Sequence, residues 1–302
     1  MDYPFLARAE ILTFEEIHRL AGIFARLGAR KFRITGGEPL LRMDLDRLIA
    51  MLARLEVGKQ AVDLALTTNG ALLGEQAERL AAAGLDRITV SLDSLDDSVH
   101  QEVSDASVPV AQVLAGIAAA EAAGLAPIKI NAVIRRGVNE NAIEDLARRF
   151  RGTGHVVRFI EFMDVGTTNG WRLEEVVSAE EILSRLTQIQ PLEPIGARYE
   201  GEVARRYRYL DGSGEVGIVA SVTQPFCGAC TRARLATDGQ LFTCLFANQG
   251  LDLRAPLRDG ASDAELVRLI AGRWAERDDR YSELRSVSTS DIERVEMSYI
   301  GG

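Results

Sequence analysis

The sequence has few cysteines, few lysines and no long apolar run. Three of its 302 residues are cysteines, and among its 35 basic residues only Lys31, Lys59 and Lys129 are lysines. No segment approaches the roughly 18 consecutive apolar residues of a membrane-spanning helix. The first residues also lack the charged and then apolar pattern of a secretion signal. We therefore expect a cytoplasmic protein with no membrane partner.

The overall charge argues against a further class of partners. The formal net charge is −9, with 47% hydrophobic and 26% charged residues, which is typical of a globular protein. Nucleic-acid-binding domains usually carry a basic face, so we expect no nucleic-acid partner. An anionic ligand would have to be held by a few placed cations. Because arginine is so strongly preferred here, the lysine in a predicted strand, Lys129, becomes a position of interest.

Strand-like and helical patterns alternate through the first half of the chain. Thr13 and Glu16 form a capping-box pattern ahead of apolar residues at helical spacing. Five alternations predict parallel strands joined by right-handed crossovers, and hence an α/β architecture. Pro109 suits the first position of its helix. The predicted helices are 14–27, 44–55, 75–83, 109–123 and 142–150, and the predicted strands are 31–34, 62–66, 87–92, 128–134 and 156–161.

Polar residues and glycines follow the predicted strands, at 36–38, 67–69, 91–93 and 164–166. In a barrel these strand ends share one rim, which is where chemistry takes place. After about residue 175 the alternation ends. We therefore predict two domains, residues 1–175 and residues 176–302. The second combines helices near 179–186 and 263–276 with a β-rich stretch at 207–222 and all three cysteines.

The cysteines indicate a metal or redox site. Cys227 and Cys230 form a C-x2-C pair, and Cys244 follows on a separate segment. An odd number of cysteines in a chain of this length does not indicate a disulfide framework. Three thiolates suit an iron–sulfur cluster with one open iron. A zinc site would need a fourth ligand that the sequence does not identify. A redox-active C-x2-C with a bystander cysteine is the third possibility.

Several motifs, taken in order, resemble the molybdenum cofactor biosynthesis protein A family of GTP 3′,8-cyclases, within the radical S-adenosylmethionine superfamily. Gly36-Gly-Glu-Pro39 at a strand end is similar to the motif of the superfamily, and the C-terminal motifs are similar to those of the family. The motifs are Arg33 to Arg42, Thr67 to Gly70, Val90 to Asp93, Arg158 to Asp164, Cys227 to Arg234, Arg277 to Tyr281 and Ser298 to Gly302.

The resemblance implies an incomplete (βα)6 TIM-like radical-SAM barrel with a C-terminal iron–sulfur extension. S-adenosylmethionine would contact Gly37, Ser91 and Met163. GTP would contact Arg33, Thr67, Lys129, Arg232, Ala233 and Arg234. Cys227, Cys230 and Cys244 would ligate a [4Fe-4S] cluster whose open iron faces the guanine, and the Gly301-Gly302 tail would reach toward the active site.

The sequence departs from the family pattern at one point. The family carries C-x3-C-x2-C after its first strand, for the cluster that reduces S-adenosylmethionine, whereas this sequence has no cysteine before Cys227. We expect an N-terminally shortened form, lacking the first strand, with that second [4Fe-4S] cluster present only in a full-length form. The 302 residues alone should not cyclise GTP.

The resemblance also implies a reaction and its partners. GTP would be converted to (8S)-3′,8-cyclo-7,8-dihydroguanosine 5′-triphosphate, which cyclic pyranopterin monophosphate synthase would consume next, and the enzyme could be a homodimer. Three other readings stay open: a GTP-binding iron–sulfur protein without radical activity, a different radical enzyme with an auxiliary cluster, and a zinc-stabilised barrel of unrelated function.

Iron analysis tests the reading of the cysteines. After anaerobic reconstitution we expect about four irons per chain, with matching sulfide. The variant Cys227→Ser/Cys230→Ser/Cys244→Ser should lose them, because the open-iron cluster needs all three thiolates. Zinc in place of iron would mean that the cysteines serve structure, and it would remove the basis for the GTP-cyclase reading.

Overall fold

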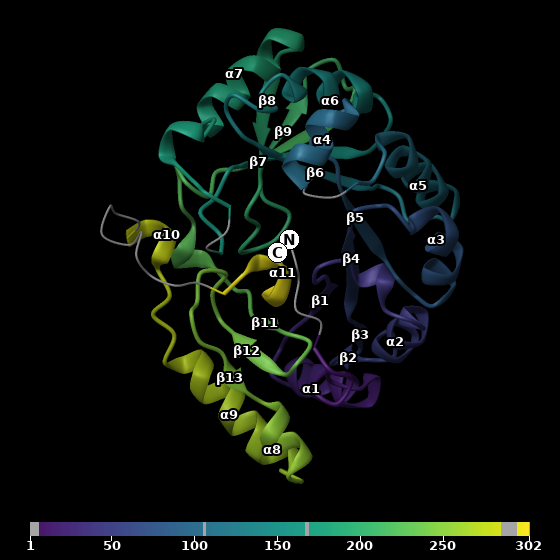
Figure 1. The fold of residues 1–302 in the computed structure, drawn as a ribbon, viewed down its shortest axis with the longest axis vertical. Coiled ribbons are helices and arrows are strands. Elements are labelled where there is room, and N and C mark those ends of the chain that lie inside the picture. Colours follow the sequence, from purple (N-terminus) through teal and green to yellow (C-terminus); the bar gives the residue numbers. More distant parts are fainter. Residues whose placement is uncertain (1–5, 105–106, 167–168, 285–294, 302) are drawn as a thin grey trace.

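The computed structural model describes residues 6–104, 107–166, 169–284 and 295–301. Its central element is one eight-stranded sheet with the order β1-β4-β5-β6-β7-β10-β9-β8 (Figure 1). Neighbouring strands from β1 to β10 run parallel, whereas β9 and β8 are antiparallel additions. The strands are β1 (Lys31–Ile34), β4 (Asp63–Thr68), β5 (Arg87–Ser91), β6 (Lys129–Ile134), β7 (Val156–Glu161), β8 (Leu192–Ile195), β9 (Arg205–Tyr209) and β10 (Glu215–Val219).

The helices of this half confirm the predicted alternation. The Thr13–Glu16 capping box is present at the start of the first helix. Pro109 is an N-cap rather than the first helical residue, and the polar helix α4 was not predicted. The helices are α1 (Phe14–Arg26), α2 (Leu45–Leu52), α3 (Leu73–Ala82), α4 (Asp97–Ser104), α5 (Val110–Ala122), α6 (Ala142–Phe150) and α7 (Ala179–Ile189), with 3-10 turns η1 (Pro39–Leu41) and η2 (Leu173–Glu175) and the hairpin β2 (Glu56–Val57) and β3 (Gln60–Ala61).

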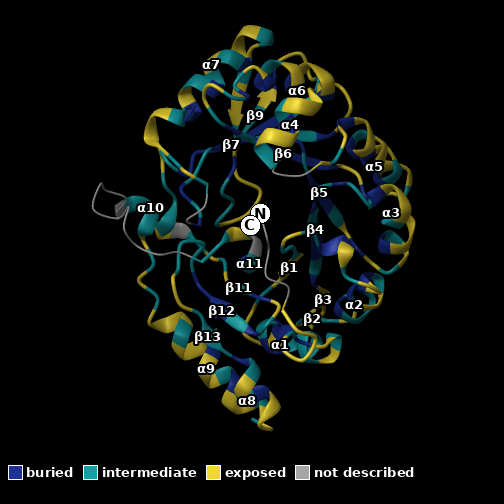
Figure 2. Cartoon of the chain, in the orientation of Figure 1, coloured by how far each residue is buried: buried dark blue, intermediate teal, exposed yellow. Residues whose placement is uncertain are grey.

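The two faces of the parallel sheet differ in character. Successive side chains of a strand point to opposite faces. One set is apolar and buried against the helices, as Figure 2 shows by the dark strands inside the partly exposed helical layer. The other set faces inward and combines charged and polar residues with the apolar Ala65, Val133 and Ile160. The apolar set includes Leu64, Leu66, Ile88, Val90, Ile130, Ala132, Val157, Phe159, Val216 and Ile218.

The C-terminal region packs against the first helix rather than against the sheet. Leu20 and Ile23 of α1 share a small core with Leu241, Leu266 and Ile270. This places α9 beside α1, on the side of the molecule away from β5 and β6 (Figure 1). The elements are η3 (Cys227–Ala229), β11 (Arg234–Leu235), β12 (Gln240–Phe242), β13 (Leu251–Asp252), α8 (Arg254–Arg258), α9 (Asp263–Ala275), α10 (Tyr281–Leu284) and α11 (Met297–Ile300).

The sheet crosses the predicted domain boundary. Strand β10 lies well after residue 175 but continues the parallel sheet beside β7, so a sixth parallel strand comes from the second predicted domain. The division at residue 175 stays a prediction. Among the described residues, no helix combines the length and the apolar character needed to cross a membrane.

The buried Glu161 joins three segments at the end of β7. Its side chain is fully buried, and its carboxylate accepts hydrogen bonds from Ala179 N at 2.7 Å, Val222 N at 2.7 Å and Thr223 N at 2.8 Å. The Thr223 hydroxyl donates a fourth. One carboxylate thus connects the last residue of β7 to the start of α7 and to the chain after β10.

Replacing Glu161 tests this connection. Glu161→Ala should reduce the free energy of unfolding by about 3 kcal/mol, because it leaves one buried and two partly buried backbone amides without an acceptor. Glu161→Gln should cost less, since one oxygen remains. The exposed Glu78→Ala in α3 is the matched control and should change stability by no more than about 0.5 kcal/mol. Equal denaturation curves for Glu161→Ala and the control would contradict this role.

Candidate functional site

The inward face of the sheet carries a cluster of four cations, Lys31 and Arg33 on β1, Lys129 on β6 and Arg158 on β7. Arg33 Nη1 donates to Thr67 Oγ1 at 2.8 Å and to Thr89 Oγ1 at 3.1 Å. Thr67 and Thr89 are paired in the register of β4 and β5. Parallel pairing therefore builds a row of hydroxyls that holds the Arg33 guanidinium across the inner face.

These cations have no acidic partner. Within the described part of the chain, no carboxylate forms an ion pair with any of the four. The nearby Asp63 is already bound by Arg87, whose Nε donates at 2.9 Å. Asp63 and Glu202 attract the cations from beyond ion-pair distance, so the four positive charges, in a protein of net charge −9, keep the capacity to receive an anion.

Burial and mutual repulsion make the cluster electrostatically unfavourable when it is empty. Burial, with the charges of Arg158, Arg87 and Arg33, lowers the pKa of Lys129 to about 7. Burial and the charge of Arg33 lower the pKa of Arg158 to about 10. Burial and Arg87 also lower the pKa of Arg33, although its side chain keeps contact with solvent.

A glycine on β10 leaves room for Arg158. Gly217 is the register partner of Arg158. A β-carbon at Gly217 would lie 3.2 Å from Arg158 Cγ and 3.4 Å from Ala204 Cβ. Because the glycine has no side chain, the arginine side chain can lie across β10 on the inner face of the sheet.

The loop after β1 forms part of the rim at the ends of the strands. Gly36 has φ +144, a region that favours glycine, and Gly37 is exposed. Glu38 accepts hydrogen bonds from Thr68 Oγ1 at 2.8 Å and from Asn69 N at 2.8 Å. The glutamate therefore holds this loop against the end of β4 and leaves the glycine backbone accessible to a ligand.

The next part of the rim contains Ser91 and Met163. Ser91 ends β5 and is paired in register with Asn131 of β6. Asn131 Oδ1 is buried and has no hydrogen-bond partner among the described residues. Met163 follows β7, and its carbonyl accepts from Asn169 Nδ2 at 2.8 Å. An orphaned acceptor beside a serine hydroxyl suits a ligand with hydroxyl or amino groups.

The cysteine region forms a second group of polar residues. Arg232 Nε and Nη2 lie 3.2 and 3.1 Å from Cys230 Sγ. Burial raises the pKa of the Cys230 thiol, but the charge and hydrogen bonds of Arg232 outweigh burial and lower it overall. Burial raises the pKa of Cys244. Cys244 and Cys227 are close enough to interact electrostatically, which the spacing in sequence suggested.

The C-terminal tail lies between this group and the rim. Arg234 Nε donates to the carbonyl of Gly301 at 3.0 Å. Gly301 is buried, and a β-carbon there would lie 2.6 Å from Thr35 Cγ2, just before Gly36. The predicted inward direction of the tail is thus seen for Gly301, while Gly302 lies outside the described residues.

The structure brings together some predicted site residues and adds others. Arg33, Thr67 and Lys129 belong to the cation cluster, whereas Arg232, the exposed Ala233 and Arg234 lie with the cysteines. Sequence reasoning missed Lys31 and Arg158 as site residues. The sequence contained a signal for Lys31, because Lys31 and Arg33 are two residues apart in one strand and therefore point to the same face.

Among the described residues, no three His, Cys, Asp or Glu side chains are placed to hold a metal ion, so the assignment of Cys227, Cys230 and Cys244 stays a prediction.

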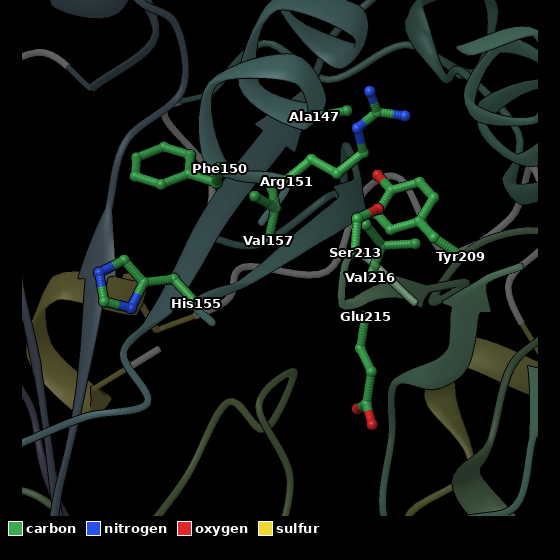
Figure 3. Close-up of a pocket in the computed structure, with 9 residues that line it drawn as sticks. All are labelled: Ala147, Phe150, Arg151, His155, Val157, Tyr209, Ser213, Glu215 and Val216. Atoms are coloured by element: carbon green, nitrogen blue, oxygen red, sulfur yellow. The ribbon is translucent and has the colours of Figure 1, made fainter. Parts of the chain in front are cut away.

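A shallow pocket lies elsewhere, between the end of α6 and the first residues of β7 and β10 (Figure 3). It is lined by Phe150, His155 and Tyr209 among others. Its strand residues Val157 and Val216 alternate with Arg158 and Gly217, so this pocket opens on the outer face of the sheet. It is therefore separate from the cation cluster.

Known proteins of one family match this chain over its whole length. Residues 3–150 match the Radical SAM superfamily, and residues 155–283 match Molybdenum Cofactor Synthesis C. A GTP 3′,8-cyclase of Acidothermus cellulolyticus is 52% identical over 100% of this chain and 89% of the relative. One from Xanthomonas campestris pv. campestris is 51% identical over 96% of this chain and 84% of the relative. One from Staphylococcus saprophyticus is 43% identical over 100% and 88%.

The low pKa of Lys129 predicts a pH dependence. Below about pH 7 the ammonium is charged, and above it the free protein loses this proton. Tripolyphosphate should therefore bind more weakly as the pH rises above 7, by up to about tenfold per pH unit until the pKa of the complex is reached. Lys129→Arg keeps its charge and should lose this dependence. Calorimetric titration of both proteins from pH 6 to 9 separates Lys129 from the ligand's own ionisation, and parallel profiles would contradict the assignment.

Proposed function

Because the chain belongs to the GTP 3′,8-cyclase family of the radical SAM superfamily, we propose that its barrel binds GTP as the substrate for radical cyclisation in molybdenum cofactor biosynthesis. The observation that carries this proposal is the cluster of Lys31, Arg33, Lys129 and Arg158, which forms no ion pair among the described residues of an acidic protein. A nucleoside triphosphate supplies about four negative charges to match it.

We assign the triphosphate to this cluster. Arg33 and Arg158 can each bind two phosphate oxygens, because a guanidinium presents parallel donors. Thr67 and Thr89 fix the direction of Arg33 through the hydrogen bonds described above. Lys129 adds a compact charge at the start of β6. Binding an anion restores the charge that burial and repulsion oppose, so the four groups become mutually compatible only when the ligand is present.

The guanosine end belongs, on this proposal, to the cysteine region. Arg232, Ala233 and Arg234 would contact the nucleoside, and Cys227, Cys230 and Cys244 would hold a [4Fe-4S] cluster beside it. The chemistry of thiols suits such a cluster, and Cys230 and Cys244 interact electrostatically with Arg234, while Arg232 lowers the pKa of Cys230. Gly301, bound to Arg234, would enclose the nucleotide from the tail side.

S-adenosylmethionine would bind at the rim. Gly37 offers exposed backbone, while Ser91 and the orphaned Asn131 Oδ1 offer polar partners and Met163 an apolar contact. When bound, this cofactor and the iron–sulfur chemistry of the family supply the hydrogen abstraction that starts cyclisation. The chain itself would orient the two ligands and exclude water in the region between the rim and the cation cluster.

The 302 residues alone should bind GTP without cyclising it. They contain no cysteine before Cys227 to hold a radical-generating cluster, which leaves the alternative of a GTP-binding iron–sulfur protein without radical activity. Supplying the C-x3-C-x2-C segment of a relative separates the two: turnover would support the cyclase, and continued inactivity with intact GTP binding the alternative. We also propose a homodimer and, as the downstream enzyme, cyclic pyranopterin monophosphate synthase.

Arg158→Met tests the triphosphate site. Losing a partly buried charge that pairs with phosphate should weaken GTP binding by about 30-fold or more, measured calorimetrically under anaerobic conditions. Arg148→Met is the matched control, because that arginine is exposed on α6 and its nearest ion pair spans 3.9 Å. GTP affinity that is equal in both variants would remove the cation cluster from the proposed function.

A further inference from the structure

The loop between β8 and β9 connects the two edges of the sheet. Strand β8 is the last strand of the sheet order and β1 is the first. Yet the ring of Tyr199, on residues 196–204 between β8 and β9, lies under the ammonium of Lys31, with Nζ 3.0 Å from the ring centroid. The curvature of the sheet therefore brings this loop against the cation cluster, from the side opposite to α2 and α3.

Hydrogen bonds fix the loop at both ends. Arg198 Nη2 and Arg206 Nη2 bind Glu215 Oε2 at 3.0 and 2.7 Å, and Arg206 Nη1 donates to the carbonyl of Gly196 at 2.7 Å. Within the loop, the Glu202 carboxylate accepts from Arg198 N at 2.7 Å. Tyr199 is thus carried by an anchored turn, although its own ring is 39% exposed.

The loop lies at the end of the cation cluster that is farther from the rim. Lys31 and Glu215 are the first residues of β1 and β10, so the loop lies at the starts of the parallel strands. Ser91, Met163 and the loop after β1 lie at the opposite ends. A nucleotide entering from the rim would meet Arg33 and Arg158 first and the Lys31–Tyr199 pair last.

We propose that Tyr199 is a positioning residue that holds the Lys31 ammonium at the deep end of the cation cluster, so that the barrel selects a nucleoside triphosphate over shorter nucleotides. This inference rests on the proposed binding of GTP. An ammonium placed on an aromatic face is attracted to it, and the remaining N–H groups stay directed away from the ring. Lys31 is exposed to solvent and forms no ion pair among the described residues, although Asp63 and Glu202 attract it, so the aromatic face is the contact that we expect to restrict its movement.

A double-mutant cycle tests the action of Tyr199 through Lys31. Dissociation constants for GTP, GDP and GMP would be measured for the full chain, Tyr199→Leu, Tyr199→Phe, Lys31→Met and Lys31→Met/Tyr199→Leu. Tyr199→Leu should weaken GTP binding about fivefold and leave GMP binding unchanged, because only the third phosphate reaches Lys31. Tyr199→Phe keeps the aromatic face and should bind like the unmodified chain. In the Lys31→Met background, Tyr199→Leu should have no further effect.

Three outcomes would overturn the inference. Equal weakening of GTP and GMP by Tyr199→Leu would show a general structural role. Additive effects of the two substitutions would show that Tyr199 does not act through Lys31. No effect of Tyr199→Leu on GTP, with tight binding by the unmodified chain, would refute the inference while leaving the proposed function intact. Failure of the unmodified chain to bind GTP would refute the proposed function itself.

Discussion

The whole site depends on holding like charges together. Lys31, Arg33, Lys129 and Arg158 repel one another, and none of them forms an ion pair among the described residues, although Asp63 and Glu202 attract them from farther away. They stay in place because the alternate residues of the same strands are buried among apolar side chains of the surrounding helices. Packing on the outer face thus supplies the free energy that keeps an unfavourable arrangement on the inner face.

The same division sets the character of the inner face. In many barrels the inward side chains are branched and apolar and fill the centre. Here arginines, lysines, threonines and a glycine stand beside the apolar Ala65, Val133 and Ile160 on that face, and Gly217 makes room for the arginine on the neighbouring strand. The charge of the inner face is therefore a direct result of which residues occupy every second strand position.

Much of this could be predicted from local sequence patterns, and the rest depends on distant contacts. The parallel strands and their helices follow from periodicity, and the capping box located the start of α1. Helix α4 escaped prediction because it is short and polar, with His100 as its buried residue. The roles of Lys31 and Tyr199 were not predicted from the sequence, because they depend on a contact between the first strand of a curved sheet and the loop before its antiparallel strand β9. No local sequence pattern in residues 196–204 predicts that contact.

The repulsion within the cation cluster affects how stable the folded protein is against unfolding and proteolysis. A ligand that binds only the folded chain stabilises it by an amount that grows with the logarithm of its concentration over its dissociation constant, about 2.7 kcal/mol at a hundredfold excess. Relief of the repulsion between Lys129 and its neighbours would be one part of the affinity that sets this dissociation constant. The resistance of the protein to unfolding and proteolysis would then rise and fall with the cellular nucleotide pool, so that scarcity of substrate would itself reduce the amount of enzyme.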